Sequence, residues 1–162
     1  GVAAAHGVAT RVVPSADYRG RREEHDAAVD AALREAGCEA VVLAGYMRVL
    51  GEAFVHGWAG RLVNIHPSLL PAFPGLQAQR QAVEAGVRWS GCTVHFVDAG
   101  VDTGPIILQR IVPVDFADTE ETLSARILAE EHVAIVQAVG LLTRGRLEIV
   151  GARVRVEGGG LP

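Results

Sequence analysis

Asn64 and His66 lie two residues apart at the end of an apolar run that begins at Arg61. In an extended chain alternate side chains point the same way, so we expect both to lie on one face of a strand. Pro67 ends that strand because it has no N–H to give to a central ladder. A polar pair at the end of an apolar strand is typical of a ligand site in an open α/β sheet.

Asp102 lies in a Gly-flanked loop between two further apolar runs. An asparagine can donate to an oxyanion, a histidine can give or take a proton near neutral pH, and an aspartate can orient the imidazole. We find no fitting nucleophile, because Ser68 lacks a nucleophile-elbow setting and Cys92 sits inside a predicted strand. The residues therefore favour direct transfer between two bound substrates over a covalent enzyme intermediate.

Other reactive side chains fit structural roles better. A zinc site made by His66, His95 and Asp102 is disfavoured because the spacing of common zinc sites is missing. His95 alternates with apolar neighbours, which predicts an ordinary hydrogen-bonded histidine on one face of a strand. Cys38 and Cys92 are too far apart for a metal or redox motif. The sequence has no lysine, which excludes Schiff-base chemistry and a Walker-type phosphate loop.

The composition predicts a soluble, single-domain protein whose main partner is not a nucleic acid. The 162 residues suit one domain, 49% of them are hydrophobic, and no apolar run is long enough to span a membrane. A formal charge of -4 and the lack of any Lys/Arg block argue against a nucleic acid partner. No secretory leader is visible, so we expect a cytoplasmic protein, as a monomer or a homodimer.

Strands alternate with helices along the chain, which predicts an α/β fold with a mostly parallel central sheet. The run at 39–44 is almost entirely apolar and is expected to be a strand covered on both faces. Further predicted strands are 9–14, 61–66, 92–97, 106–114 and a terminal pair within 147–156. Predicted helices are 17–36, 52–58, 76–85 and 119–142, the last with Asp118 or Thr119 as its cap.

Two motifs resemble the folate-dependent formyltransferase family: NIHPSLLPAFPG at 64–75 and GVDTGPIILQ at 100–109. The helix start PGLQAQRQA and the GPIILQ segment are similar to the phosphoribosylglycinamide formyltransferases within that family, and the similarity runs from Gly7 to about Glu148. The resemblance implies a Rossmann-like α/β fold. It also implies transfer of a formyl group from 10-formyltetrahydrofolate, as co-substrate and without a metal, to the glycine amine of glycinamide ribonucleotide.

The resemblance also implies roles for individual residues. Asn64, His66 and Asp102 match the catalytic positions of the family. The expected folate pocket is formed by Met47, Arg48, Val49, Leu50, Val97, Asp98 and Val101. The expected contacts with the ribonucleotide are Arg22, Pro67 and Glu131.

This sequence departs from the family pattern in two places. The opening strand, Gly-rich phosphate turn, helix and second strand of the family have no counterpart, so we expect the 1–162 formyltransferase domain to be N-terminally incomplete. Gln77 and Gln79 stand where many members have histidine or other polar residues. Two rival functions remain open: a 10-formyltetrahydrofolate hydrolase with water as acceptor, and a folate-binding module without turnover.

Overall fold

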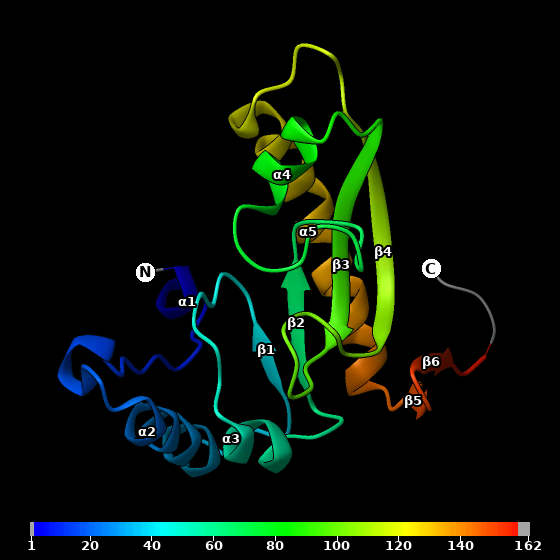
Figure 1. Ribbon diagram of the computed structural model, residues 1–162. Coiled ribbons are helices and arrows are strands. Elements are labelled where there is room, and N and C mark those ends of the chain that lie inside the picture. The colour runs from blue at the N-terminus through cyan, green and yellow to red at the C-terminus, as the bar shows by residue number, and fades with distance from the viewer. Residues whose placement is uncertain (1, 159–162) are drawn as a thin grey trace.

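The computed structural model describes residues 2–158 and has a four-stranded sheet at its centre (Figure 1). Its strands are β1 (Val41–Leu43), β2 (Leu62–His66), β3 (Trp89–Phe96) and β4 (Ile106–Pro113), in the order β1-β2-β3-β4. The predicted α/β class is confirmed. The expected mostly parallel pairing is wrong for these strands, because β1 and β2 are parallel but β2–β3 and β3–β4 are antiparallel.

The direction of the β3–β4 pair follows from its connection. The 97–105 loop between β3 and β4 is shorter than the roughly dozen residues that a parallel crossover needs, so those strands form a hairpin. An apolar run has the same pattern whether its strand pairs in the parallel or the antiparallel direction, so the sequence does not show the pairing direction. The run at 39–44 forms only the short strand β1, at the edge of the described sheet, and Val42 is 38% exposed there. The expectation of cover on both faces is therefore wrong for this strand.

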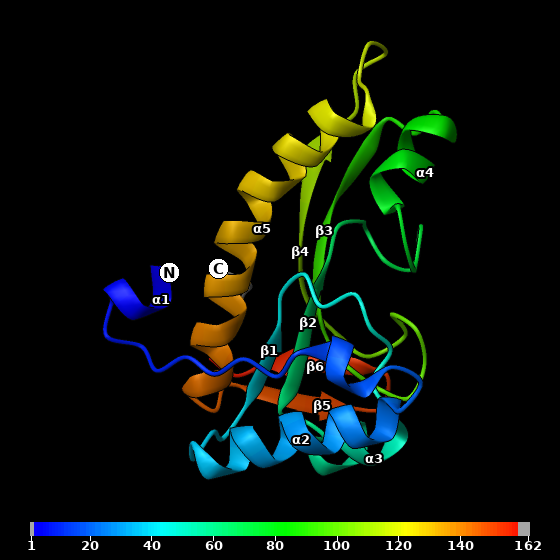
Figure 2. The same cartoon turned by 90° about the vertical axis from the view of Figure 1, so that its left-hand side faces the viewer.

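Helices pack against the sheet in two places. The long helix α5 (Glu120–Thr143) runs along one face of β3 and β4 (Figure 2), and α4 (Ala78–Glu84) packs against it. Leu123 and Ile127 on α5 are fully buried against Val94 and Phe96 of β3. The result is a rigid support behind the strand ends that carry Asn64 and His66.

A second, smaller core joins α2 (Arg22–Glu35) and α3 (Glu52–Gly57) to the other end of β1 and β2. Its centre is Trp58, which is fully buried beside Phe54 and Leu62. The indole Nε1 of Trp58 donates to Asp30 Oδ1 at 2.7 Å, so its buried polar atom is satisfied. This core fixes the two ends of the 44–51 loop that walls the site described below.

The remaining elements are small. α1 (Val2–Ala5) and a 3-10 turn, η1 (Ser15–Tyr18), precede α2, so the predicted 17–36 helix begins later than expected and the predicted strand at 9–14 is irregular chain. Strands β5 (Leu147–Val150) and β6 (Arg153–Val156) form the predicted terminal pair. Even α5 lacks the length of apolar sequence needed to cross a membrane, and no other helix within residues 2–158 has it.

Of the two predicted caps of α5, Asp118 and Thr119, the structure has Thr119 as the N-cap. Thr122 N donates to Thr119 Oγ1 at 3.4 Å, and Thr119 N donates to Thr122 Oγ1 at 2.9 Å. Thr119→Ala removes one of these hydrogen bonds and should lower the free energy of unfolding by about 1 kcal/mol in urea titrations. Thr119→Ser keeps the hydroxyl and is the matched control. Equal stability of the alanine and serine variants would contradict the capping role.

Candidate active site

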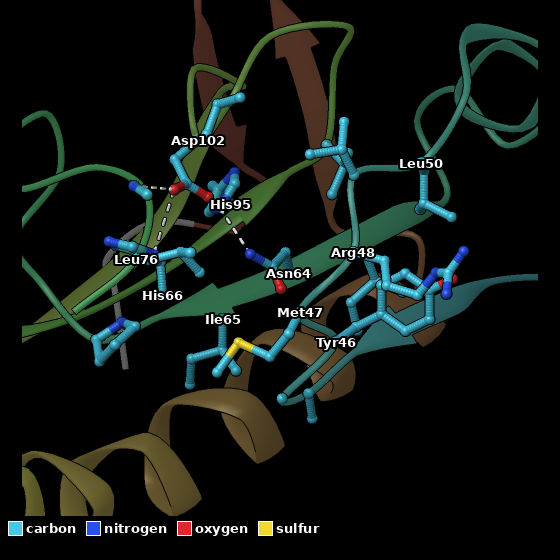
Figure 3. Close-up of a pocket in the computed structure, with 18 of the residues that line it drawn as sticks. Tyr46, Met47, Arg48, Leu50, Asn64, Ile65, His66, Leu76, His95 and Asp102 are labelled. Atoms are coloured by element: carbon cyan, nitrogen blue, oxygen red, sulfur yellow. Dashed lines mark hydrogen bonds and ion pairs between the residues drawn. The ribbon is translucent and has the colours of Figure 1, made fainter. Parts of the chain in front are cut away.

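Asn64 and His95 face each other across β2 and β3. The two residues are register partners, and Asn64 Nδ2 lies 3.4 Å from His95 Nε2 (Figure 3). The pairing of β3 with β4 shifts between Val94 and His95, a β-bulge of the kind that re-aims a side chain. His66 ends β2, and Asp102 reaches the same place from the 97–105 loop. Two strand ends and one loop thus bring four polar side chains together.

His66 is buried, with both ring nitrogens facing oxygen atoms. Its Nε2 lies 2.8 Å from the carbonyl oxygen of Phe73, and its Nδ1 lies 3.3 Å from Asp102 Oδ2. A carbonyl oxygen only accepts, so Nε2 carries the N–H that donates to Phe73, while Nδ1 lies in ion-pair range of the Asp102 carboxylate. The carboxylate can support a positive charge on the ring when the reaction places one there, which suits a proton donor or an electrostatic role.

His95 is 2% exposed and is held as a neutral ring. Its Nδ1 donates to the carbonyl oxygen of Phe96 at 2.9 Å, which leaves Nε2 as the acceptor for the Asn64 amide. Burial lowers the pKa of His95 below its ordinary value of 6.5, more than the nearby charge of Asp102 raises it. His95 thereby fixes the Asn64 amide, so that the remaining N–H of Asn64 is available to the site.

Asp102 joins the two loops that flank the site. Its Oδ2 accepts from Gly75 N at 2.8 Å, and its Oδ1 lies 3.7 Å from His95 Nε2. The backbone of Asp102 is left-handed, with φ of 54°, a conformation uncommon for residues other than glycine. The carboxylate is thus placed between the two imidazoles and can support a positive charge on His66.

The four side chains open into a cavity of ≈ 630 Å³. Apolar residues surround it: Met47 and Leu76 are largely exposed, while Ile65 packs against the main core (Figure 3). Glu131 reaches the cavity from α5, and burial raises the pKa of its carboxyl. A mostly apolar cavity with a few polar groups at one end can hold a flat aromatic ligand beside a reacting centre.

Most of the chain matches one known protein family. A family model described as formyl transferase matches residues 1–139. The chain belongs to the formyl transferase family. It is 51% identical over 148 residues to the trifunctional purine biosynthetic protein adenosine-3 of Drosophila pseudoobscura pseudoobscura, an alignment that covers 91% of this chain but only 11% of that protein.

Solved structures support the same assignment. Glycinamide ribonucleotide transformylase 1 from Symbiobacterium toebii superposes with a TM-score of 0.91 at 52% identity, covering 95% of this formyl transferase chain and 72% of that one. A formyltetrahydrofolate deformylase from Pseudomonas syringae pv. tomato superposes with a TM-score of 0.89 at 28% identity, covering 96% of this chain and 51% of that one. The Rossmann-like formyltransferase fold predicted from sequence is therefore confirmed.

Most of the site residues predicted for this formyl transferase line this cavity. These are Met47, Arg48, Val49, Leu50, Asn64, His66, Pro67, Val97, Asp98, Val101, Asp102 and Glu131, and Gln77 and Gln79 lie there too. Arg22 is the exception: it is exposed at the start of α2 and is not among the cavity residues. The structure thus gives no support for a contact between Arg22 and a ligand in this cavity.

The sequence did not predict that His95 contacts another residue of the site. The alternation along β3 predicted a hydrogen-bonded histidine, and both ring nitrogens indeed have partners, but one partner is Asn64. That contact depends on which residue of β2 faces His95, and the sequence alone does not give the register. Within residues 2–158 no group of three or more His, Cys, Asp or Glu side chains is arranged to hold a metal ion, so the zinc alternative has no site here.

The lowered pKa of His95 predicts how stability changes with pH. Below about pH 6.5 the unfolded chain binds a proton at this histidine while the folded chain does not, so the free energy of unfolding should fall as the pH drops. His95→Phe removes this contribution and should show a shallower fall between about pH 7.5 and about pH 5.5 in urea titrations. His56→Phe, at an exposed site on α3, is the matched control. Equal slopes for the wild type and His95→Phe would contradict a buried, neutral His95.

Proposed function

We propose that this protein transfers a formyl group from 10-formyltetrahydrofolate to the glycine amine of glycinamide ribonucleotide, a step of purine biosynthesis. The proposal rests on one observation: Asn64, His66 and Asp102 converge at the end of a mostly apolar cavity in a formyl transferase chain. The transformylase named in the structural comparison supports this acceptor. The proposal concerns the whole protein, because the chain spans only about a tenth of the trifunctional relative.

The arrangement suits direct attack through a tetrahedral intermediate. The acceptor amine adds to the formyl carbon, and the carbonyl oxygen becomes an oxyanion. The free N–H of Asn64 would donate a hydrogen bond to that oxygen. A positive charge on His66, supported by the Asp102 carboxylate, would stabilise the oxyanion electrostatically.

The proton released by the amine must then reach the departing folate nitrogen. Asp102 contacts His66 and lies at the edge of the cavity, so it can accept the proton and pass it on through water. The intermediate collapses when the bond from the formyl carbon to the folate nitrogen breaks. No enzyme nucleophile takes part, which agrees with the lack of an activated serine or cysteine at the site.

The two walls of the cavity suggest where each substrate lies. The 44–51 loop and the 97–105 loop enclose the apolar part, which suits the folate ring system. The contacts would come from Met47, Arg48, Val49 and Leu50 of the first loop and from Val101 and the backbone of Val97 and Asp98 in the second. Pro67 and Glu131 lie at the cavity as well, and the carboxylate of Glu131 would bind the acceptor amine. Arg22 is not part of this proposal, because it does not reach the cavity.

The wider setting follows from charge and chemistry. Small-molecule substrates require no nucleic acid or membrane, and the net charge of -4 favours neither an anionic polymer nor an anionic surface. We propose that residues 1–162 belong to one formyltransferase domain, which acts in the cytoplasm as a monomer or a homodimer.

One assay separates the proposed function from its rivals. The protein is incubated with 10-formyltetrahydrofolate, with and without glycinamide ribonucleotide, and both products are followed by mass spectrometry. We expect the formylated ribonucleotide to form in step with tetrahydrofolate. Formate released without the ribonucleotide would instead indicate a hydrolase, the activity named for the Pseudomonas syringae neighbour. Binding of the folate without any product would indicate a binding module.

A further inference from the structure

The Asp98 carboxylate forms two hydrogen bonds within its own loop. One carboxylate oxygen, Oδ1, accepts from Gly100 N at 3.1 Å and from the Thr103 hydroxyl at 2.7 Å. These two bonds close the 98–103 turn around Asp102. We infer that Asp98 and Thr103 are positioning residues, which hold the Asp102 carboxylate against His66; the inference rests on the proposed formyl transfer.

The closed turn leaves little room for another conformation. A Cβ atom at Gly100 would lie 2.0 Å from Thr103 Oγ1, and one at Gly104 would lie 1.8 Å from the Phe96 carbonyl oxygen. Neither distance is possible, so only glycine fits at these two positions while the turn is closed. The turn is therefore closed by the hydrogen bonds of Asp98, and the glycines at 100 and 104 leave the space that the closed turn needs.

Asp102 is the residue that this turn constrains. It is left-handed at φ of 54°, and a residue with a side chain keeps such a backbone only where its surroundings fix it. If the turn opened, Asp102 could relax to an extended backbone and its carboxylate would leave Gly75 and His66. The Asp98–Thr103 hydrogen bond thus acts on the chemistry through Asp102, without touching a substrate itself.

Matched variants test this. Thr103→Val keeps the shape of the side chain but removes the donor, and it should lower kcat by about ten-fold while the KM for 10-formyltetrahydrofolate changes by less than about two-fold. Thr103→Ser keeps the hydroxyl and should retain kcat. Asp98→Ala should behave like Thr103→Val, and Asp98→Asn should restore kcat because its amide oxygen can accept the same bonds. A rise in KM with kcat unchanged would overturn the inference, since it would mean that Asp98 contacts the folate directly.

A second comparison asks whether the effect passes through Asp102. In an Asp102→Asn background, adding Thr103→Val should cause no further loss of kcat, because the carboxylate that the turn positions is already gone. If kcat of the double variant fell by the product of the two single losses, Thr103 would act independently of Asp102, which would contradict the proposal.

A measurement without turnover keeps this test separate from the proposed function. The imidazole nitrogen signals of His66, recorded by NMR, report its contact with the Asp102 carboxylate. Thr103→Val should shift these signals and Thr103→Ser should leave them unchanged. If the wild type forms no formylated product but the signals shift as expected, the proposed function fails while the positioning role stands. Unchanged His66 signals in Thr103→Val would refute the positioning role whatever the activity.

Discussion

Replacing His66 by glutamine should lower kcat for formyl transfer by about a thousand-fold. Glutamine can still donate to the Phe73 carbonyl, but it cannot take up a proton beside Asp102 and so cannot carry a positive charge. The affinity for a folate analogue should change by less than about two-fold, because the apolar walls of the cavity are untouched. Steady-state kinetics and calorimetry would measure the two quantities.

The control for this prediction is His56→Gln. His56 is exposed on α3 and lies outside the cavity, so the same substitution there should leave kcat and folate binding as in the wild type. A His66→Gln enzyme with near-normal kcat would show that the imidazolium is not needed for the transfer.

Replacing Asn64 by leucine should lower kcat by about a hundred-fold or more, the loss typical when one donor to an oxyanion is removed. Leucine has a similar shape but no N–H, so the developing charge would lose a hydrogen bond and His95 Nε2 would lose its partner. Rapid mixing under single-turnover conditions would place the loss in the chemical step.

The matched control is Gln137→Leu, an amide-to-leucine change on α5 outside the cavity. It should leave the single-turnover rate unchanged. If Asn64→Leu instead raised KM and kept kcat, Asn64 would bind the ground state and would not stabilise the intermediate.

The placement of Asn64, His66 and Asp102 at one cavity could be predicted in part, because it depends on local sequence pattern. Asn64 and His66 share one strand, and the period of two along that strand is enough to place them on the same face. Asp102 was marked by its glycine neighbours, and the structure gives it the left-handed backbone that such a loop allows. These predictions needed no knowledge of which strands pair.

What could not be predicted depends on pairing. The role of His95 follows from its register with Asn64, and the direction of β3 follows from how a Pro-rich loop and α4 return the chain to the sheet. The local pattern of apolar and polar residues predicts neither this register nor this strand direction. The predicted strand at 9–14 failed in a similar way, because a β-branched run forms a strand only where a neighbour accepts its hydrogen bonds, and in the structure that run lies outside the sheet.

The hydrogen bond of the His66 ring also fixes its tautomer. A carbonyl oxygen can only accept, so Nε2 carries the hydrogen that is donated to Phe73, and Nδ1 is left to face the Asp102 carboxylate. Any proton that the ring gains or loses during turnover is therefore exchanged at Nδ1, beside Asp102. The loop that follows β2 thus decides which atom of His66 takes part in proton movement, although the loop carbonyl need not touch a substrate itself.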